Sequence, residues 1–573
     1  MSSKTTLPEV SLTALISSNT APSESEKEAT RTISKNLQSK LDSLNVEISG
    51  LLAIVEEKLR DRDSIQASLT AHQAVLHPIR SLPPEILSQI FCHCLAENVN
   101  PTISGLQIPN RPVPSAAPLL LARICRGWRK VALGTPQLWT ALKLDIRANS
   151  TSNPWWQRQR VFLSLWMSRA GGLPMVMSVY IFGDISFSLL EYGTIRETFN
   201  RSSHRWKAIH WICSASKQIQ DYVLPLLTAY AGRFPALETC SFNLSGSAGI
   251  PLRRYANPPN IIFRDACFFH NLPKLRNVQM DAVYASIWFA LPCRRITSLT
   301  LVGHRHSPMS ISVKECFHLI KACPLLETLN LRCGIVDNVE PGAAPIEHPL
   351  LKSFSVLFIS VPYTQLPTTG LNVLFDQLVF PALQTLVIVS RGPTSRWAQV
   401  DSFTKFLSPM IGTLRRIEIQ SLGPEGLAIL PCLRLCANIT HLSLELNHVD
   451  NAILSVFGPG QDGQLPFRYL KYLKIDGFFS CSSQAFNSFV KAVLGTNKES
   501  EEPCCLRHLI LQCRRLPSPA LPFTTQESAD LLRSRIANGL DVQIYGELQP
   551  ASAQCRFSFA APALVAIPGQ SQR

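Results

Sequence analysis

The stretch Ile439–Val449 reads ITHLSLELNHV, and its spacing decides the fold. Apolar residues stand at Ile439, Leu442 and Leu444, separated first by two residues and then by one. Alternating apolar residues that precede a turn are typical of a half-buried strand. Eleven such units occur between Trp206 and Leu506, with steps of 21 to 38 residues and a mean step of 30. The other ten units begin at Trp206, Leu237, Leu275, Ile296, Leu326, Leu351, Leu383, Leu414, Leu470 and Leu506.

Helical segments separate several of these strand units. ECFHLIKACP (315–324), DSFTKFLSPMIG (401–412) and QAFNSFVKAVLG (484–495) all carry apolar residues at helical spacing. One strand and one helix about every 30 residues require right-handed crossovers and a parallel sheet. We therefore predict an α/β fold in which residues 206–511 supply parallel strands to one sheet. The alternative is an ordinary α/β domain that also contains a parallel sheet.

The sequence also predicts the secondary structure at the two ends of this array. TALKLDI (140–146) and VMSVYIFG (176–183) are candidates for its first strands, and 527–546 reads as a last helix and strand. Residues 549–573 are rich in Ala, Pro and Ser, so we expect a flexible tail. The array is therefore assigned to residues 147–548.

The N-terminal part begins with a Ser/Thr/Glu-rich segment, residues 1–30, which we expect to be a disordered tail. Residues 31–77 then predict a coiled-coil-like amphipathic helix, with two apolar rows that alternate at spacings of three and four. Lys58, Arg62 and His72 interrupt the rows. The helix either self-associates or packs on its own chain, and the pattern does not decide between the two. The rows are Leu41, Ile48, Val55, Leu69 and Leu76, and Leu37, Leu44, Leu51 and Ile65.

A second short helix is predicted within RSLPPEILSQIFCHCL (80–95). Pro83 and Pro84 fit its first turn, and Ser81 is the candidate cap. Apolar residues cover more than half of its circumference, so it must lie inside a domain or bind a partner. These residues form two adjacent rows, Ile86 and Ile90, and Leu87, Phe91 and Leu95.

Residues 97–118 contain five prolines and predict a loop. The segment 118–146 predicts a helix, a turn at Thr135-Pro136 and a strand. The apolar row of that helix is Leu120, Ile124, Trp128 and Val131. Two or three short helices of this size bury only a modest core, which favours a partner on the leftover apolar face.

LPPEILSQIF followed by LLLARICRGWRKVALGTPQLW resembles an F-box of the type common among fungal F-box proteins, over about residues 79–144. The resemblance assigns residues 78–146 to an F-box-like module that docks on the Skp adaptor of SCF ubiquitin ligases. It implies partner contacts at Leu82, Pro83, Ile86, Leu87 and Ile90. Trp128 and Trp139 are expected to hold the core of the module and its junction with the array.

The repeats resemble a degenerate leucine-rich repeat array. The opening stretch completes the longer signature of that family, with Asn447 in the ladder position and Val449 after it. Together the two resemblances imply a substrate-recognition adaptor of an SCF-type ligase, with an unidentified protein target bound by the repeats. The alternative is a scaffold outside any ligase, with a self-associating N-terminal helix and a basic repeat surface.

Composition argues against several classes of protein, namely membrane, secreted and zinc-finger proteins. The chain has 46% hydrophobic residues, no apolar run of 18 residues and no signal-peptide core, so we expect a cytoplasmic or nuclear protein. Its 17 cysteines lie mostly in apolar runs and are expected to be buried thiols. Cys92 and Cys94, and His304 and His306, lack a second pair at zinc-finger spacing.

The net charge is +15, and residues 151–310 hold 17 Lys/Arg against 7 Asp/Glu. We expect a solvated basic surface that includes Arg253, Arg254, Arg294 and Arg295, and nucleic acid is an unlikely ligand because no binding motif is present. Catalytic motifs such as GxSxG, the P-loop and HExxH are absent from the sequence. We expect no enzyme, no metal and no cofactor, with the histidines at 210, 318 and 441 in structural roles.

Overall fold

A computed structural model describes most of the repeat strands and helices and the N-terminal helices. The chain divides into two compact units, Met1–Leu87 and Ser88–Arg573. In the described part of the chain, no helix is long and apolar enough to cross a membrane. The described residues are 17, 21–96, 99–101, 107–109, 115–147, 153–182, 197, 201–213, 234–244, 272–281, 293–302, 311–332, 335–336, 345–359, 370–391, 399–422, 424–460, 465–494, 505–516, 525–548, 554–558 and 565–568.

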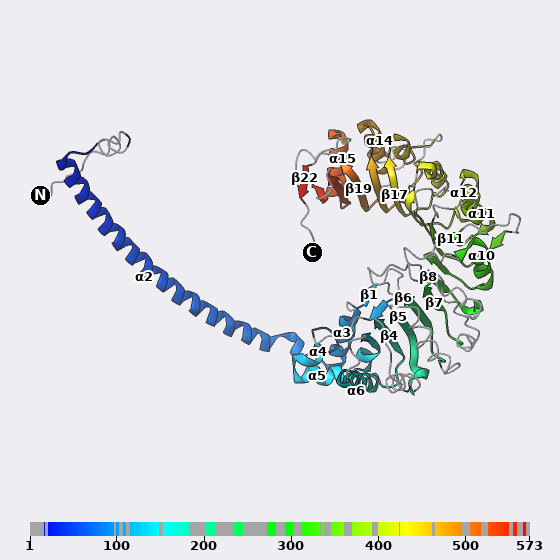
Figure 1. Cartoon of the computed structure of the whole chain (residues 1–573), viewed down its shortest axis with the longest axis horizontal. Helices are drawn as coiled ribbons and strands as arrows, with labels where there is room; N and C mark the ends of the chain where they lie inside the picture. The colour runs from blue at the N-terminus through cyan, green and yellow to red at the C-terminus, as the bar shows by residue number, and fades with distance from the viewer. Residues whose placement is uncertain are drawn as a thin grey trace. The chain divides into compact units, whose positions relative to one another are not determined.

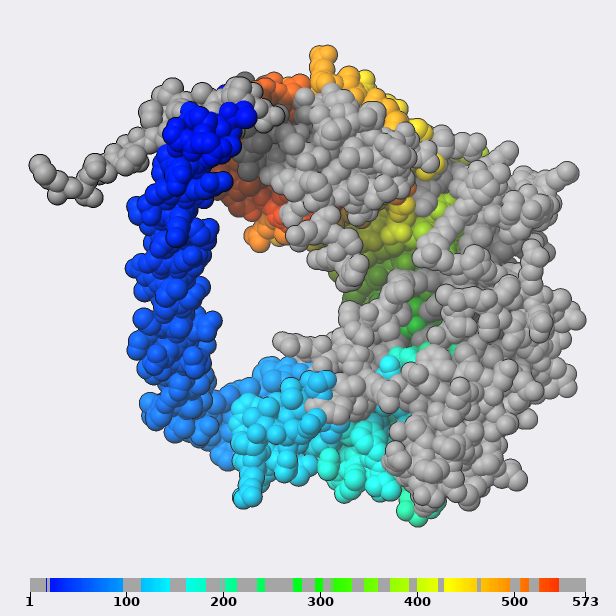
Figure 2. All heavy atoms as spheres, turned by 60° about the vertical axis from the view of Figure 1, so that its left-hand side comes forward, coloured from blue at the N-terminus to red at the C-terminus, as the bar shows by residue number. Residues whose placement is uncertain are grey.

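The first unit is dominated by one helix, α2 (Glu24–Leu76), of 53 residues. Figure 2 draws it as a continuous rod in blue. The helix starts earlier than expected, because a capping box satisfies its first amides: the Glu26 amide donates to Ser23 Oγ and the Ser23 amide donates to Glu26 Oε2. The Ser23 hydroxyl, which donates to Glu26 Oε2 at 2.6 Å, and then the Ser23 amide lower the pKa of the Glu26 carboxyl. The expected disordered tail therefore gives way to helix at residue 24, and no residue of α2 is buried.

The second unit is built on a 16-stranded sheet whose strands follow one another in chain order (Figure 1). Its strands are β3 (Ala141–Arg147), β4 (Met175–Phe182), β5 (Trp206–Cys213), β6 (Thr239–Leu244), β7 (Asn277–Asp281), β8 (Ser298–Val302), β10 (Thr328–Arg332), β13 (Ser353–Ile359), β15 (Thr385–Arg391), β16 (Arg416–Leu422), β17 (His441–Val449), β18 (Tyr472–Phe479), β19 (His508–Leu516), β20 (Asp541–Leu548), β21 (Gln554–Ser558) and β22 (Val565–Pro568).

The prediction of parallel strands over residues 206–511 is confirmed. All eleven apolar units become strands of this sheet, β5 to β19, and each pairs in parallel with the next. The register places the same repeat position on neighbouring strands, as in the pairs Phe354–Leu386 and Leu386–Ile417. These three side chains are fully buried, so equivalent apolar residues stack into a continuous core.

The helices of the repeats lie on one face of this sheet (Figure 1). The three predicted helices are present as α10 (Val313–Ala322), α12 (Val400–Leu407) and α14 (Ser483–Leu494). Two further helices are α11 (Gly370–Gln377) and α13 (Asn451–Ser455). Aromatic contacts join neighbouring helices: Phe375 of α11 stacks on Phe406 of α12 with ring centroids 4.7 Å apart.

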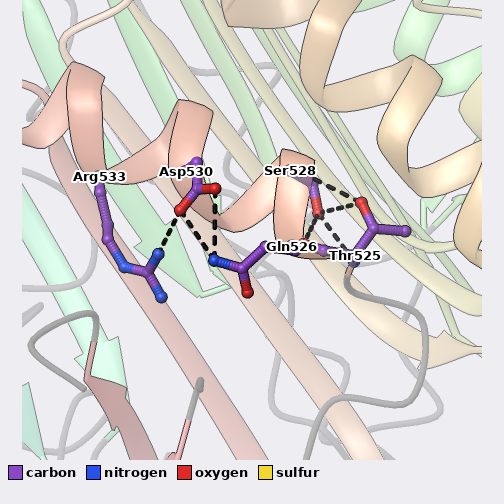
Figure 3. A network of polar contacts seen from close by, with 5 residues as sticks. All are labelled: Thr525, Gln526, Ser528, Asp530 and Arg533. Carbon is purple, nitrogen blue, oxygen red and sulfur yellow. Dashed lines mark hydrogen bonds and ion pairs between the residues drawn. The ribbon is translucent and has the colours of Figure 1, made fainter. Parts of the chain in front are cut away.

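Both expected ends of the array are confirmed. Strands β3 and β4 pair in parallel with each other, and β4 pairs with β5. At the other end, α15 (Gln526–Ala537) is followed by β20, which pairs in parallel with β19. Thr525 and Ser528 form a second capping box at the start of α15, beside the ion pair of Asp530 with Arg533 (Figure 3).

The expected flexible tail is wrong in part. Within residues 549–573, β21 pairs antiparallel with β20, and β22 pairs antiparallel with β21. The Ala/Pro/Ser-rich composition did not predict these short strands, because their apolar residues alternate only weakly. They form by backbone pairing with the preceding strand, which the sequence pattern does not reveal.

The ladder role expected for Asn447 is also wrong. Asn447 is exposed, because the pairing of β17 with β18 shifts between Glu445 and His448. Val449 is buried as expected. Two other asparagines bridge successive repeats: the Ser482 amide donates to Asn451 Oδ1 at 2.8 Å, and the Gln399 amide donates to Asn372 Oδ1 at 2.7 Å.

A close approach of backbones follows that register shift. Gly477 in β18 lies against β17, and an added Cβ would come within 2.7 Å of the Leu446 carbonyl oxygen and 3.0 Å of Val449 Cγ2. Real Cβ atoms essentially never come this close to a carbonyl oxygen, so any larger residue must push the two strands apart.

We therefore expect Gly477→Ala to lower the free energy of unfolding by about 1–3 kcal/mol, the usual cost of overpacking. Gly412→Ala is the matched control, since an added Cβ there meets nothing within 4 Å. Chemical denaturation of the two variants measures the difference, and equal stability of both would contradict the close approach.

A row of polar side chains crosses the sheet from β4 to β8. Ser178, His210, Ser241, Gln279 and Thr300 occupy equivalent positions, and each is at most 7% exposed. Burial lowers the pKa of His210 from 6.5 to about 4. Its Nδ1 has no hydrogen-bond partner among the described residues, so nothing there stabilises the imidazolium.

This burial predicts a pH-dependent stability. Below about pH 6.5 the unfolded chain binds a proton at His210 that the folded chain binds only near pH 4, so stability falls as the pH is lowered between these values. The expected loss is about 2 kcal/mol at pH 5. His210→Gln should remove that part of the pH dependence of the thermal midpoint, whereas the exposed His448→Gln should retain it. An unchanged pH dependence in His210→Gln would show that His210 is not the source.

Candidate functional site

The short helix predicted to bind a partner is α3 (Pro84–Ala96). Pro84 occupies its first position, and the Pro83 carbonyl accepts the amides of Ile86 and Leu87. Ser81 is not the cap: it ends a short 3₁₀ turn, and its hydroxyl donates to the Pro78 carbonyl oxygen at 2.8 Å. The Pro-Pro pair is therefore compatible with the start of the helix at Pro84.

The two apolar rows of α3 differ in burial. Leu87 and Phe91 are 7% and 0% exposed, whereas Ile86 and Ile90 are 42% and 37% exposed. Pro83 is exposed and Leu82 is half-buried. Of the five expected partner contacts, Leu87 therefore belongs to the core. Ile86 and Ile90 lie one turn apart and form an exposed apolar row.

Phe91 is held by an aromatic contact within the helical module, which we define as α3, α4 (Leu121–Ile124), α5 (Arg126–Leu133) and the 3₁₀ turn Pro136–Trp139. Its ring lies 4.9 Å from the ring of Trp128 in α5. The burial of Phe91 fixes the rotation of α3 about its own axis. That rotation leaves Ile90 toward solvent.

Trp139 packs at the junction between the helical module and the sheet. It is fully buried, and its Nε1 donates to the Ala132 carbonyl oxygen at 2.9 Å. Its ring meets Trp166 of α6 (Asn153–Arg169) edge-on at 4.8 Å, and Trp166 Nε1 donates to the Ala141 carbonyl oxygen of β3. The expected roles of Trp128 and Trp139 are thus confirmed.

The segment expected to be one helix is two. Cys125 is extended between α4 and α5, and the amide of Trp128 donates to its Sγ at 3.4 Å. This break rotates the predicted row, so that Leu120 and Ile124 are exposed while Leu121 and Ala132 are buried. The spacing of the apolar residues could not reveal the break, because Cys125 caps the second helix from within a helix-like pattern.

A pocket of about 450 Å³ lies on the surface of α4 and α5, with an apolar floor and three arginines around it. The arginines are Arg123, Arg129 and Arg169. Arg129 Nε donates to the Ala122 carbonyl oxygen at 2.8 Å, and the Arg169 guanidinium lies over the Trp139 ring at 4.5 Å. Apolar surface rimmed by arginine is suited to an acidic protein partner.

The expected loop over residues 97–118 contains two short strands. β1 (Val99–Pro101) and β2 (Gln107–Pro109) pair antiparallel in this stretch. The prolines stand at the last residue of each strand, where a missing amide donor is tolerated.

A second candidate surface is formed by one row of side chains that crosses strands β16 to β20. The register aligns one position on five strands: Arg416, His441, Tyr472, His508 and Asp541. The rings of His441 and Tyr472 stack at 5.9 Å, and Tyr472 lies 6.3 Å from His508. Four of these residues line a pocket of about 410 Å³. We call the five residues the aromatic row.

The surroundings shift the pKa of two residues in this row. Burial first, and then the charges of Arg416 and Lys471, lower the pKa of His441. Burial also raises the pKa of Tyr472. His508 Nδ1 lies 3.2 Å from Asp541 Oδ2. The row therefore offers a neutral imidazole, a phenol and a paired histidine, which suit hydrogen bonding and stacking with a polypeptide.

Arg514 of β19 forms ion pairs with residues on the two preceding strands of the sheet. Its guanidinium bonds Asp476 on β18 and Glu445 on β17, each at 2.8 Å. The hydrogen bond that Arg514 donates to Asp476 is the main reason that the pKa of Arg514 is raised. One cation thus joins three strands through two carboxylates.

Sequence reasoning missed the aromatic row, although its signal is present. In LRRIEI, ITHLSL, LKYLKI and LRHLIL, the third letter of each unit is Arg416, His441, Tyr472 or His508. Because parallel strands align equivalent positions, the third letters of successive units lie side by side. Treating each histidine singly concealed the row.

The other expectations have mixed outcomes. Arg294 and Arg295 are exposed as predicted, whereas Arg253, Arg254, His304 and His306 lie outside the described residues. Seven of the twelve cysteines with described side chains are buried, and Cys92 and Cys94 are half-buried. Over the described ranges no group of three or more His, Cys, Asp or Glu side chains could hold a metal ion.

No model of a known protein family matches the chain, and no curated protein matches it in a sequence search.

The three-strand bridge predicts a local stability effect. Arg514→Gln removes the cation and leaves two carboxylates facing each other, so we expect a loss of about 1–2 kcal/mol in the free energy of unfolding. Arg533→Gln is the control, because its pair with Asp530 lies within one helix turn and is worth about 0.5 kcal/mol or less. Equal losses in urea denaturation would remove the special role of Arg514.

Proposed function

We propose that this chain is the substrate-recognition adaptor of an SCF-type ubiquitin ligase. The F-box-like module binds a Skp-like adaptor, and the leucine-rich-repeat-like sheet binds a protein target. The adaptor contributes proximity: it holds the target close to a ubiquitin-loaded enzyme and performs no chemistry itself. Such a ligase would act in the cytoplasm or the nucleus.

The exposed row of Ile86 and Ile90 is the observation that carries the proposal. The row directly follows the Leu82-Pro83 pair, in the segment that resembles an F-box. Burying one such side chain fully is worth roughly 1.5–3 kcal/mol, so two isoleucines left in water favour a partner that covers them. The buried Leu87 and Phe91 hold the opposite side of the helix in the core.

The aromatic row supports the second half of the proposal. Tyr, Arg and His side chains stand on the face of the sheet that the helices leave uncovered, and tyrosine and arginine dominate binding energy at protein interfaces. We therefore propose Arg416, His441 and Tyr472 as contacts to the target. The alternative function is a scaffold outside a ligase, favoured by the exposed N-terminal helix.

A binding experiment with a purified Skp-like protein tests the proposal. Ile86→Asp combined with Ile90→Asp should weaken binding at least a hundredfold, about 2.7 kcal/mol, and leave the thermal midpoint unchanged because both side chains are already exposed. Leu350→Asp combined with Leu435→Asp is the matched control: it places the same two charges on exposed leucines of the repeat region and should bind normally.

Leu87→Asp separates docking from folding. Because Leu87 is buried, this variant should lower the thermal midpoint, whereas the Ile86/Ile90 variant should not. A wild-type chain that melts cooperatively and fails to bind the Skp-like protein at micromolar concentration would exclude the ligase function. It would favour the scaffold.

A further inference from the structure

The helix α2 presents a long apolar seam, and among the described residues none of this helix is buried. Nine of the twelve seam positions between Leu37 and Leu76 are apolar, and each of the nine is between 48% and 82% exposed. At 1.5 Å per residue this seam extends for about 60 Å. Exposed leucines, isoleucines and valines over that length require a partner of matching length and spacing.

We propose that α2 forms a parallel, in-register, two-stranded coiled coil with α2 of a second copy of the chain. This inference goes beyond the proposed function and does not depend on it. With Leu41 taken as position a, one heptad register runs from Leu37 to Leu76, and Lys58, Arg62 and His72 occupy three of its twelve seam positions. The repeat covers more than five heptads, whereas three to four are enough to indicate a coiled coil.

The residue types at the seam point to two strands. In the first apolar block, Ile48 and Val55 stand at position a and Leu37, Leu44 and Leu51 at position d. The other apolar seam positions are leucine at a (Leu41, Leu69, Leu76) and isoleucine at d (Ile65). β-Branched residues at a, combined with leucine at d, favour parallel dimers over trimers and tetramers. The next residues outward agree: Ile54 at position g would meet Leu59 at position e of the second copy.

The polar interruption fits the same arrangement. Lys58 at d and Arg62 at a break the apolar seam. Each already lies beside a carboxylate on its own helix, with Lys58 Nζ 3.5 Å from Asp61 and Arg62 2.6 Å from Asp63. In a two-stranded coil the long side chains reach water from the seam, whereas a core of three or four helices would bury their charges.

The relative direction of the two helices in the coiled coil follows from the positions of the apolar blocks along α2. Leu37 to Val55 forms six consecutive apolar layers, and Ile65 to Leu76 forms a shorter block. A parallel register matches each block with itself, giving nine apolar layers. An antiparallel register over the same length would place Lys58 against Val55 and Arg62 against Leu51, so half of its layers would pair an apolar residue with a charged or polar one.

The first test is the oligomeric state of the full chain by analytical ultracentrifugation. At low micromolar concentration the wild type should sediment as a dimer, twice the chain mass of 63.6 kDa. Leu44→Glu with Leu51→Glu should weaken the dimer at least a hundredfold. Glutamate keeps helix propensity close to that of leucine, so the helix itself persists.

Val46→Glu with Ala53→Glu is the matched control. These two residues are also seven apart in the same stretch, but they stand at position f, opposite the seam. The control adds the same charge and should remain dimeric. A monomeric wild type, a trimer or tetramer, or equal disruption by the two variants would each overturn the proposal.

Disulfide trapping tests the direction. In a parallel pair Leu44 faces Leu44 of the second copy, so Leu44→Cys alone should give a covalent dimer under mild oxidation, with the wild type as the control for native cysteines. In an antiparallel pair Leu44 would face Leu69. Crosslinking only in a mixture of Leu44→Cys and Leu69→Cys chains would overturn the parallel direction.

Discussion

Backbone hydrogen bonding between strands that run in the same direction is the constraint on which the sheet depends. A parallel strand cannot pair through a tight turn, so every strand must be followed by a crossover segment before the next one. From β3 to β20 each strand of the large sheet pairs in parallel with the next strand of that sheet along the chain. The shared register then decides burial: a single position of the repeat becomes a continuous apolar stack, and the next position becomes a continuous surface row.

That constraint explains which parts of the fold were predictable. Spacing alone located eleven strands and three helices, because burial of alternate residues imposes the pattern on each unit separately. The side of α3 that faces the core was not predictable, since both of its rows are apolar and only the contact of Phe91 with Trp128 distinguishes them. The same holds for Cys125, which breaks a helical pattern by capping, and for Asn447, which a register shift moves into solvent. The burial of Phe91 and the position of Asn447 depend on neighbours that are distant in the sequence, whereas the cap at Cys125 is local but leaves the apolar spacing unchanged.

The two halves of the sheet place their polar rows at different positions of the repeat. From β4 to β8 the second surface position holds small or amide side chains and one histidine, and all are buried. From β16 to β20 the first surface position holds arginine, histidine, tyrosine and aspartate, which remain partly open. A repeat architecture can vary these positions freely, because they lie outside the apolar stacks that hold the strands together. Recognition can therefore change in one half without altering the core of the other.

The antiparallel strands β21 and β22 change how the sheet ends. A regular parallel array exposes, at its last strand, the same unpaired donors and acceptors that every inner strand uses to recruit its neighbour. Another molecule could continue such an array without limit, as happens in strand-mediated aggregation. The antiparallel pairing of β21 with β20 occupies that edge from within the chain, and β22 becomes the last strand of the sheet. The edge of the last parallel repeat is therefore covered by the chain's own backbone.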